Sequence, residues 1–455
     1  MASFDEIQEY CHTVCAQIRW KKARPLVEKE LQDHLCDQAA AYRTAGMNEQ
    51  SAIHSAVQQM GDAVSVGAAL DKAHRPRPQW VLLVLTGSLL LVGQFFSAVF
   101  GGAAEPLGLL CAAAALLGCY YFDAFALMQR RPLPFYFGSL LICAFALLRT
   151  FSINGYAWGS LFGVSFPLSF LSLGFPLVFS MLIYALRGCG LFGVLLCGAG
   201  YLPLAFLLAH IPTISGLFLF TSAALALLCF ALAKGWFGCN KAAGFALVLI
   251  PVAAGIGLLI WFIFNTPSVL ARISILFDPA ADKSGLGYLV YVVRNVLAAA
   301  KPYGTGSAVA GDPAALGFLD RASSDYLLTL LIYRFGWVAL VLVVIAFAAF
   351  GILCCRSIAK QKSMLGSLVA ISVLSVLLLQ CLFYLAANLS YSLLEPFSLP
   401  FLSAGNAALV INAALTGLML SVFRSGDGLC DHCPGKTSSS LFSYQNGSLT
   451  IHIKN

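Results

Sequence analysis

Residues 80–100 read WVLLVLTGSLLLVGQFFSAVF, an uncharged run dominated by leucine, valine and phenylalanine. A helix needs about 20 such residues to cross the hydrocarbon core of a bilayer, so this stretch predicts a membrane-spanning helix. Of the 455 residues, 60% are hydrophobic and only 10% are charged, and the mean hydropathy is +0.84. This composition leaves too little polar surface to cover a soluble globule, and it predicts an integral membrane protein.

Nine further apolar segments follow the first one along the chain. They are residues 106–128, 134–151, 166–186, 191–209, 214–233, 242–264, 326–354, 365–387 and 400–423. Each is near the length that a helix needs to cross a membrane. The sequence therefore predicts an all-α membrane domain of about ten transmembrane helices, over residues 79–424.

Basic residues indicate how this domain is oriented. They gather on alternate connectors, at Arg75, Arg77, Arg130, Arg131, Arg187, Lys234, Lys241, Arg356, Lys360, Lys362 and Arg424. The short connectors on the opposite side contain Arg149 alone. Because cytoplasmic loops carry the excess of Lys and Arg, this bias predicts a multi-pass protein with both termini in the cytosol.

A small helical domain is predicted before the membrane domain, over residues 1–78. Apolar residues recur there at helical spacing, as at Ile7, Cys11 and Val14. The string MGDAVSVGAALDKAHRPRP resembles the prefix domain that precedes membrane segments in bacterial permease-like and regulatory proteins. With no converging acid, base and nucleophile, we interpret it as a cytosolic adaptor. The tail, residues 425–455, is rich in Ser and Gly and is predicted to be a disordered cytosolic peptide.

The net charge of +7 does not indicate a nucleic-acid partner, because the basic residues are dispersed over connectors and form no basic face. Most of the 15 cysteines stand singly in apolar runs, where a thiol packs as a small hydrophobe. Cys430, His432 and Cys433 could supply two or three ligands to zinc, but no second pair completes a tetrahedral set. We therefore expect no metal site there.

One connector on the predicted outer side, residues 265–325, is much longer than the others and contains charges of both signs. A long loop in an otherwise tightly connected domain is usually functional. Its charges are compatible with an outward-facing site for an anionic lipid headgroup. They are equally compatible with a solvated loop whose charges keep it out of the bilayer.

Several motifs in and after this loop resemble those of the SEDS family, the FtsW, RodA and SpoVE type proteins of cell-wall synthesis. The segment RISILFDPAADKSGLGYL, residues 272–289, is similar to the family's Arg, Phe, Asp-Pro, Asp, Gly-x-Gly-Tyr signature. Three further matches follow in the family's order: YGTG at 303–306, SSDYLL at 323–328 and SLPFLSAGNAALVIN at 398–412. The family's architecture also has ten helices, with a large outer loop between helices seven and eight.

This resemblance implies a peptidoglycan glycosyltransferase that polymerises lipid II at the outer face of the bacterial cytoplasmic membrane, with a class B penicillin-binding protein as its partner. The family's essential acid, at the start of helix eight, corresponds to Asp325. Glycosyl transfer from a pyrophosphate donor needs a base for the acceptor proton and positive charge for the leaving group. Arg272, Lys301 and Arg321 are the candidate cations, and a divalent cation such as Mg²⁺ or Mn²⁺ could share that role.

Two residues have alternative interpretations. Asp325 could simply belong to the first turn of helix eight, where an acid favours the helix dipole. Arg334 follows it by nine residues and should lie roughly 13 Å along that helix, inside the hydrocarbon. An intramembrane arginine usually faces a partner. A lipid phosphate, Asp123 and a backbone carbonyl are all candidates.

The sequence also departs from the family pattern at polar positions. The residues that stand where the family usually has a different one are Phe170, Thr213, Thr305, Tyr333, Arg334, Asn406 and Ala407. These departures keep a second interpretation open, a non-enzymatic SEDS-like paralogue that binds a lipid-linked precursor or recruits partners of division, elongation or sporulation. A lipid-precursor transporter is a third interpretation, although the predicted helices contain few midplane polar residues.

Overall fold

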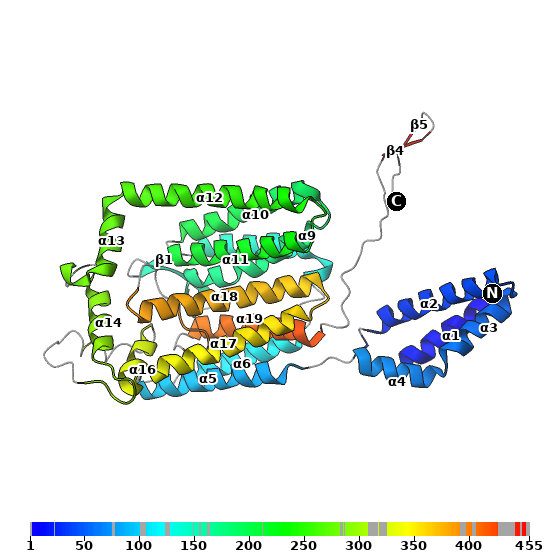
Figure 1. The fold of residues 1–455 in the computed structure, drawn as a ribbon, viewed down its shortest axis with the longest axis horizontal. Coiled ribbons are helices and arrows are strands. Elements are labelled where there is room, and N and C mark those ends of the chain that lie inside the picture. Colours follow the sequence, from blue (N-terminus) through cyan, green and yellow to red (C-terminus); the bar gives the residue numbers. More distant parts are fainter. Residues whose placement is uncertain are drawn as a thin grey trace.

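A computed structural model of the chain is almost entirely helical, with a small N-terminal group of helices and a larger bundle (Figure 1). It describes residues 2–451 apart from 22, 75–77, 101–105, 123–127, 149, 154–155, 162–163, 212, 283–284, 286, 308–316, 318–324, 392–396, 403–405, 426–441 and 446–447.

The N-terminal group has a core of its own. It consists of α1 (Ala2–Gln17), α2 (Arg24–Thr44), α3 (Glu49–Met60) and α4 (Ala63–His74). The apolar stripes seen in the sequence meet inside it, and Val14, Ile18 and Leu35 are fully buried there. Asn48 caps α3, since its side chain accepts a hydrogen bond from the Ser51 amide at 2.7 Å.

Within the described residues, eight helical stretches are long and apolar enough to cross a membrane. They are α5 (Trp80–Phe100), η1 (Leu168–Leu173) with α9 (Phe175–Ala185), α10 (Gly190–His210), α11 (Ile214–Ala233), α12 (Lys241–Asn265), α17 (Val338–Ala359), α18 (Met364–Asn388) and α19 (Asn406–Ser425). Two apolar helices of 16 residues, α6 (Pro106–Tyr121) and α8 (Pro132–Leu147), occupy the two remaining predicted segments. The predicted all-α membrane fold is confirmed, and a count of ten spans stays a prediction.

Helix α18 lies at the centre of the bundle, where it contacts α9, α11, α16, α17 and α19. Gln380 of α18 and Asn412 of α19 are both buried and exchange two amide hydrogen bonds, of 3.0 and 3.1 Å. Helices α6 and α19 approach each other closely, because a Cβ atom at Gly417 would lie 2.4 Å from the Leu116 carbonyl oxygen. Close backbone approach at small residues is typical of helix packing in membranes.

Two parts of the chain contain strands that the sequence analysis did not predict. The connector after α8 forms an antiparallel sheet in the order β1 (Thr150–Ile153), β2 (Tyr156–Leu161) and β3 (Val164–Pro167). In the tail predicted to be disordered, β4 (Phe442–Gln445) pairs with β5 (Ser448–Ile451). An Asn-Gly pair separates β4 from β5 in the sequence, which is a strong hairpin signal.

The predicted continuous helix over residues 326–354 is wrong. The structure divides it into α16 (Leu327–Phe335) and α17, with Gly336 between them at φ +90°. A Cβ atom at Gly336 would lie 2.5 Å from the Cα atom of Tyr303, so the loop before α16 packs directly against this break. Arg334 therefore lies in the last turn of a short helix, with its side chain exposed, and not inside a continuous spanning helix.

The long connector is itself largely helical. It forms α13 (Pro267–Phe277), η2 (Pro279–Asp282) and α14 (Tyr288–Ala298), and it leads to α16. Figure 1 shows α13, α14, α16 and the β1 strand together at one end of the bundle, which we call the loop end. Outside the loop end, the α9–α10 connector pairs with the α11–α12 connector. The backbone amides of Gly188 and Gly190 donate hydrogen bonds to the carbonyl oxygens of Trp236 and Phe237.

Replacing Gly336 with alanine should lower the thermal stability of the detergent-solubilised protein. The backbone conformation at φ +90° and ψ 177° is one that residues with a Cβ atom adopt at a cost of about 1–3 kcal/mol, and the new methyl group would also clash with the 302–303 backbone. Melting measured by intrinsic fluorescence tests this. Gly87→Ala in α5 is the control, because no heavy atom lies within 4 Å of its added methyl group. Equal melting temperatures for the two variants would contradict the prediction.

Candidate functional site

The candidate site is built around α16 at the loop end of the bundle. Asp325 precedes Tyr326, the N-cap residue of α16, and its side chain is exposed. The first turn of α16 contains no acidic residue. Asp325 thus lies one residue before the N-cap, beside the N-terminus of α16, where an acid still favours the helix dipole.

Asn388, the last residue of α18, holds the start of α16 in place. Its side-chain oxygen accepts a hydrogen bond from the Thr329 amide at 2.9 Å. Its side-chain nitrogen donates to the carbonyl oxygens of Asp325 and Tyr384, both at 3.0 Å. The Thr329 hydroxyl in turn donates to the Asn388 carbonyl at 3.0 Å. The side chains of Asn388 and Thr329 are both completely buried, so these bonds form inside the protein.

These hydrogen bonds satisfy backbone amides at the start of α16. The first amides of a helix have no partner within the helix, and leaving one buried and unbonded costs about 1–3 kcal/mol. In α16 the Thr329 amide bonds to Asn388, and the Leu328 amide is 3.4 Å from the hydroxyl of Tyr384. Two residues of α18 therefore supply partners to the start of α16, and one of them, Asn388, holds the backbone carbonyl of Asp325.

The glycine-rich turn YGTG packs against the other end of α16. Gly304 and Gly306 donate backbone hydrogen bonds to the carbonyl oxygens of Phe335 and Tyr333, at 3.0 and 2.7 Å. The Thr305 hydroxyl donates to the Arg334 carbonyl at 3.3 Å. Just beyond the helix, the Trp337 amide donates to the carbonyl oxygen of Lys301 at 3.1 Å. The turn and the end of α16 are thus joined along their backbones.

The predicted cations occupy different places. Lys301 and Arg334 belong to the two segments joined at the end of α16, and both side chains are exposed. A nine-residue helix is about 13 Å long, so this basic end and Asp325 lie at opposite ends of α16. Arg272 is exposed on α13, a separate helix of the same connector.

Other predicted residues fall outside the described part of the chain. They are Arg321, Ser323, Ser324, the proposed Arg334 partner Asp123, and the Cys430, His432 and Cys433 cluster. Among the residues that are described, no three His, Cys, Asp or Glu side chains lie close enough together to hold a metal ion.

The sequence pattern did not identify Asn388, Thr329 or Tyr384 as residues of the site. Each is a single polar residue at a helix end, within or beside an apolar segment, and nothing along the chain connects the last turn of α18 with the start of α16, about 60 residues away. The signal available in the sequence is that polar residues are rare in membrane helices and usually have a hydrogen-bond partner. It indicates that Asn388 is bonded, but it does not identify the bonded residue.

Asn388→Leu should destabilise the protein, because the Thr329 amide and the Asp325 carbonyl lose their buried partner at a cost of about 1–3 kcal/mol each. The melting temperature in detergent tests this. Asn265→Leu is a matched control, because Asn265 also ends a long apolar helix, but its side chain is exposed and bonds to the Trp261 carbonyl of its own helix. If both leucine variants melt alike, the Asn388 bonds do not stabilise α16.

Solved structures of other proteins share this fold over about three quarters of the chain. A chain from the structure titled "Structural coordination of polymerization and crosslinking by a peptidoglycan synthase complex" matches with a TM-score of 0.59 and 19% identity, over 76% of this chain and 98% of that one. The rod shape determining protein RodA of Thermus thermophilus matches with a TM-score of 0.51 and 18% identity, over 77% and 97% of the two chains. At these identities the likeness establishes the fold alone.

Curated relatives are named probable peptidoglycan glycosyltransferase FtsW. The protein from Acinetobacter baylyi is 29% identical over 185 residues, which are 40% of this chain and 45% of the relative. The protein from Thioalkalivibrio sulfidiphilus is 27% identical over 225 residues, 48% and 53% of the two chains. The chain thus matches about half the length of these relatives. A family model described as "Cell cycle protein", of FtsW, RodA and SpoVE type, matches residues 93–427, most of the chain. The chain therefore belongs to the FtsW, RodA and SpoVE family, the SEDS proteins.

Proposed function

We propose that this protein is a peptidoglycan glycosyltransferase that polymerises lipid II, with Asp325 as the general base. The observation that carries the proposal is an exposed carboxylate whose backbone is held by a buried amide, at the loop end of a membrane bundle. A base must be accessible to substrate and fixed in position to take a proton efficiently. The exposure of Asp325 and the Asn388 bond to its backbone carbonyl support this role, and the names of the curated relatives supply the reaction class.

In the proposed reaction, the hydroxyl oxygen of the acceptor sugar attacks the anomeric carbon of the donor as its proton passes to the Asp325 carboxylate. The bond between that carbon and the pyrophosphate oxygen breaks, and the electron pair leaves with the lipid pyrophosphate. Positive charge near the leaving group stabilises the charge that develops there. Lys301 and Arg334 are the described side chains best placed for this role, and Arg272 and Arg321 are further candidates from the same connector.

The proposed orientation places the loop end outside the cytoplasmic membrane and both termini in the cytosol. It follows from the basic connectors, which the positive-inside rule assigns to the cytosolic side. The polymer is assembled on the outer face, so Asp325 must lie there for the proposal to hold. A class B penicillin-binding protein is the proposed partner, supported by the similarity to a chain of a complex that coordinates polymerisation and crosslinking.

The second candidate function is a non-enzymatic member of the family that binds a lipid-linked precursor or recruits partners. The observation that favours it is that several residues departing from the family pattern have structural roles in this protein. The Thr213 hydroxyl caps α11, and the Thr305 and Tyr333 hydroxyls bond to backbone carbonyls of Arg334 and Ser307. Side chains used in this way stabilise the fold and contribute no charge to catalysis.

Asp325→Asn should reduce glycan polymerisation from lipid II by about 10²- to 10⁴-fold, because the amide cannot accept the acceptor's proton. The purified protein is assayed alone and with a candidate transpeptidase partner, and chain formation is read on gels. Asp33→Asn, which alters an exposed acid of α2 outside the membrane domain, is the control and should polymerise like the wild type.

Two outcomes would contradict the proposal. Equal polymerisation by wild type and Asp325→Asn would remove Asp325 as the base. A wild-type protein that is correctly folded, binds lipid II and makes no chains with any partner would instead support the non-enzymatic function.

A further inference from the structure

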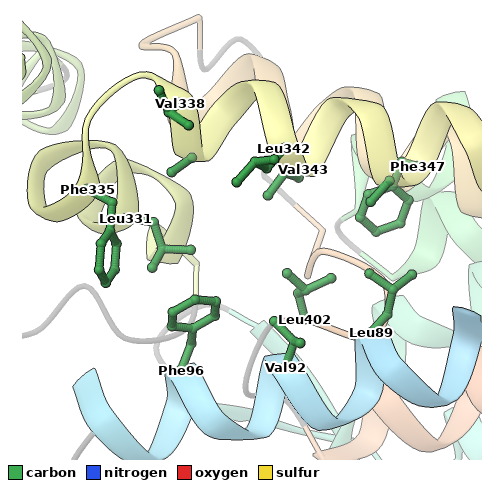
Figure 2. A pocket seen from close by; sticks show the side chains of 12 residues that line it. Leu89, Val92, Phe96, Leu331, Phe335, Val338, Leu342, Val343, Phe347 and Leu402 are labelled. Atoms are coloured by element: carbon green, nitrogen blue, oxygen red, sulfur yellow. The ribbon is translucent and has the colours of Figure 1, made fainter. Parts of the chain in front are cut away.

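An apolar groove of about 450 Å³ runs along the bundle between α5 and α17, and α16 closes one end of it. In Figure 2, Val92 and Phe96 of α5 point into the groove from one side, and Val343 and Phe347 of α17 point into it from the other. Phe335 of α16 lies at the closed end. The side chains that line the groove are aliphatic or aromatic, so the ligand it suits is a hydrocarbon.

The closed end of the groove lies beside the basic end of α16. Leu331 and Phe335 both line the groove, and Arg334 is three residues after Leu331 on the same helix, so it lies on a neighbouring part of the helix surface. Val338 lines the groove as well, and its amide donates to the carbonyl oxygen of Pro302, the residue after Lys301. The backbone segments that carry Lys301 and Arg334 therefore lie beside the end of the apolar groove, and both residues are exposed.

We propose that this groove binds the polyprenyl chain of a lipid pyrophosphate, with Lys301 and Arg334 contacting the pyrophosphate. The choice of a polyprenyl chain rests on the proposed function, in which a lipid pyrophosphate is both the carrier of the substrate and the leaving group. The charges are complementary, because a lipid pyrophosphate places its anionic group directly at the end of its hydrocarbon chain.

The lining of the groove and the charge at its end favour a lipid chain with an anionic head as the occupant. A flexible hydrocarbon chain can follow the groove along α5 and α17. In a bilayer the chain leaves one hydrocarbon environment for another, so shape and the charged end must provide the selectivity.

Photolabelling of the full-length protein in nanodiscs tests this inference. The probe is a polyprenyl pyrophosphate with a diazirine in its chain, and labelled peptides are identified by mass spectrometry. In the wild type, we expect labels on α5, α16 and α17. Labels confined to other helices would overturn the inference, and this measurement requires no variant.

Filling the groove should reduce the labelling at least tenfold. Val92→Trp and Val343→Trp place a large ring among its lining side chains. Leu91→Trp and Val341→Trp are matched controls, because these neighbours on the same two helices are 63% and 53% exposed and do not line the groove. We expect both controls to label like the wild type. Equal labelling of folded groove and control variants would overturn the inference.

The charged end has its own test. Lys301→Gln and Arg334→Gln should each weaken labelling by about 3- to 10-fold, and Arg334→Lys should restore most of it, because a phosphate contact needs the positive charge. A phosphatidylglycerol probe with the same diazirine should label the groove much less. If it labels equally well, the groove is a general lipid site and the inference fails.

Asp325→Asn separates this inference from the proposed function. It should reduce polymerisation by about 10²- to 10⁴-fold and leave polyprenyl labelling unchanged, because Asp325 lies at the opposite end of α16 from the basic residues. An Asp325→Asn protein that polymerises normally would defeat the proposed base and leave the labelling result intact. A wild-type protein that polymerises lipid II but carries no label on α5, α16 or α17 would overturn the inference about the groove and leave the proposed function intact.

Discussion

Hydrogen bonding of polar groups inside the bundle is the constraint on which this structure depends, because lipid offers no partner to a backbone amide or a side-chain amide. Asn388 shows how the chain meets it. Placed at the end of α18, its side chain bonds to backbone groups of Thr329, Asp325 and Tyr384. At the other end of α16, the break at Gly336 leaves the carbonyl oxygens of Tyr333 and Phe335 without helical partners, and amides of the 304–306 turn bond to them instead.

The same constraint shapes the candidate site. Helix α16 is short and almost completely buried, and it is held at both ends by segments distant in the chain. Its start carries an exposed acid and its last turn an exposed arginine. In the proposed reaction, Asp325 and the basic residues act from opposite ends of this helix, which is about 13 Å long. The apolar groove begins at the end of α16 that carries Arg334, and in our proposal it receives the lipid chain.

Residues that depart from the family pattern still fit this framework. The Tyr333 hydroxyl donates to the Ser307 carbonyl, and the Thr305 hydroxyl donates to the Arg334 carbonyl. Both bonds add to the contact between the 303–306 turn and α16 that the backbone bonds of the turn's glycines already make. Asn406 approaches Gly108 of α6 so closely that a larger residue at Gly108 would clash with its side chain. Similarity of fold at 18–19% identity is consistent with this, because helix packing can be conserved while individual polar residues change.

Hydrophobic length and charge placement were enough to predict a membrane bundle, its helical segments and the long connector, because crossing a bilayer demands about 20 apolar residues wherever it occurs. The motif order also identified the family, which the match over residues 93–427 confirms. Local sequence did not predict the break at Gly336 or the β1–β3 sheet, since both depend on packing against other segments. Asn388 beneath Asp325, and the groove that α5 and α17 form together, come from residues far apart in the chain. Only tertiary structure decides such pairings, because a polar side chain needs a partner but its own sequence does not specify which one.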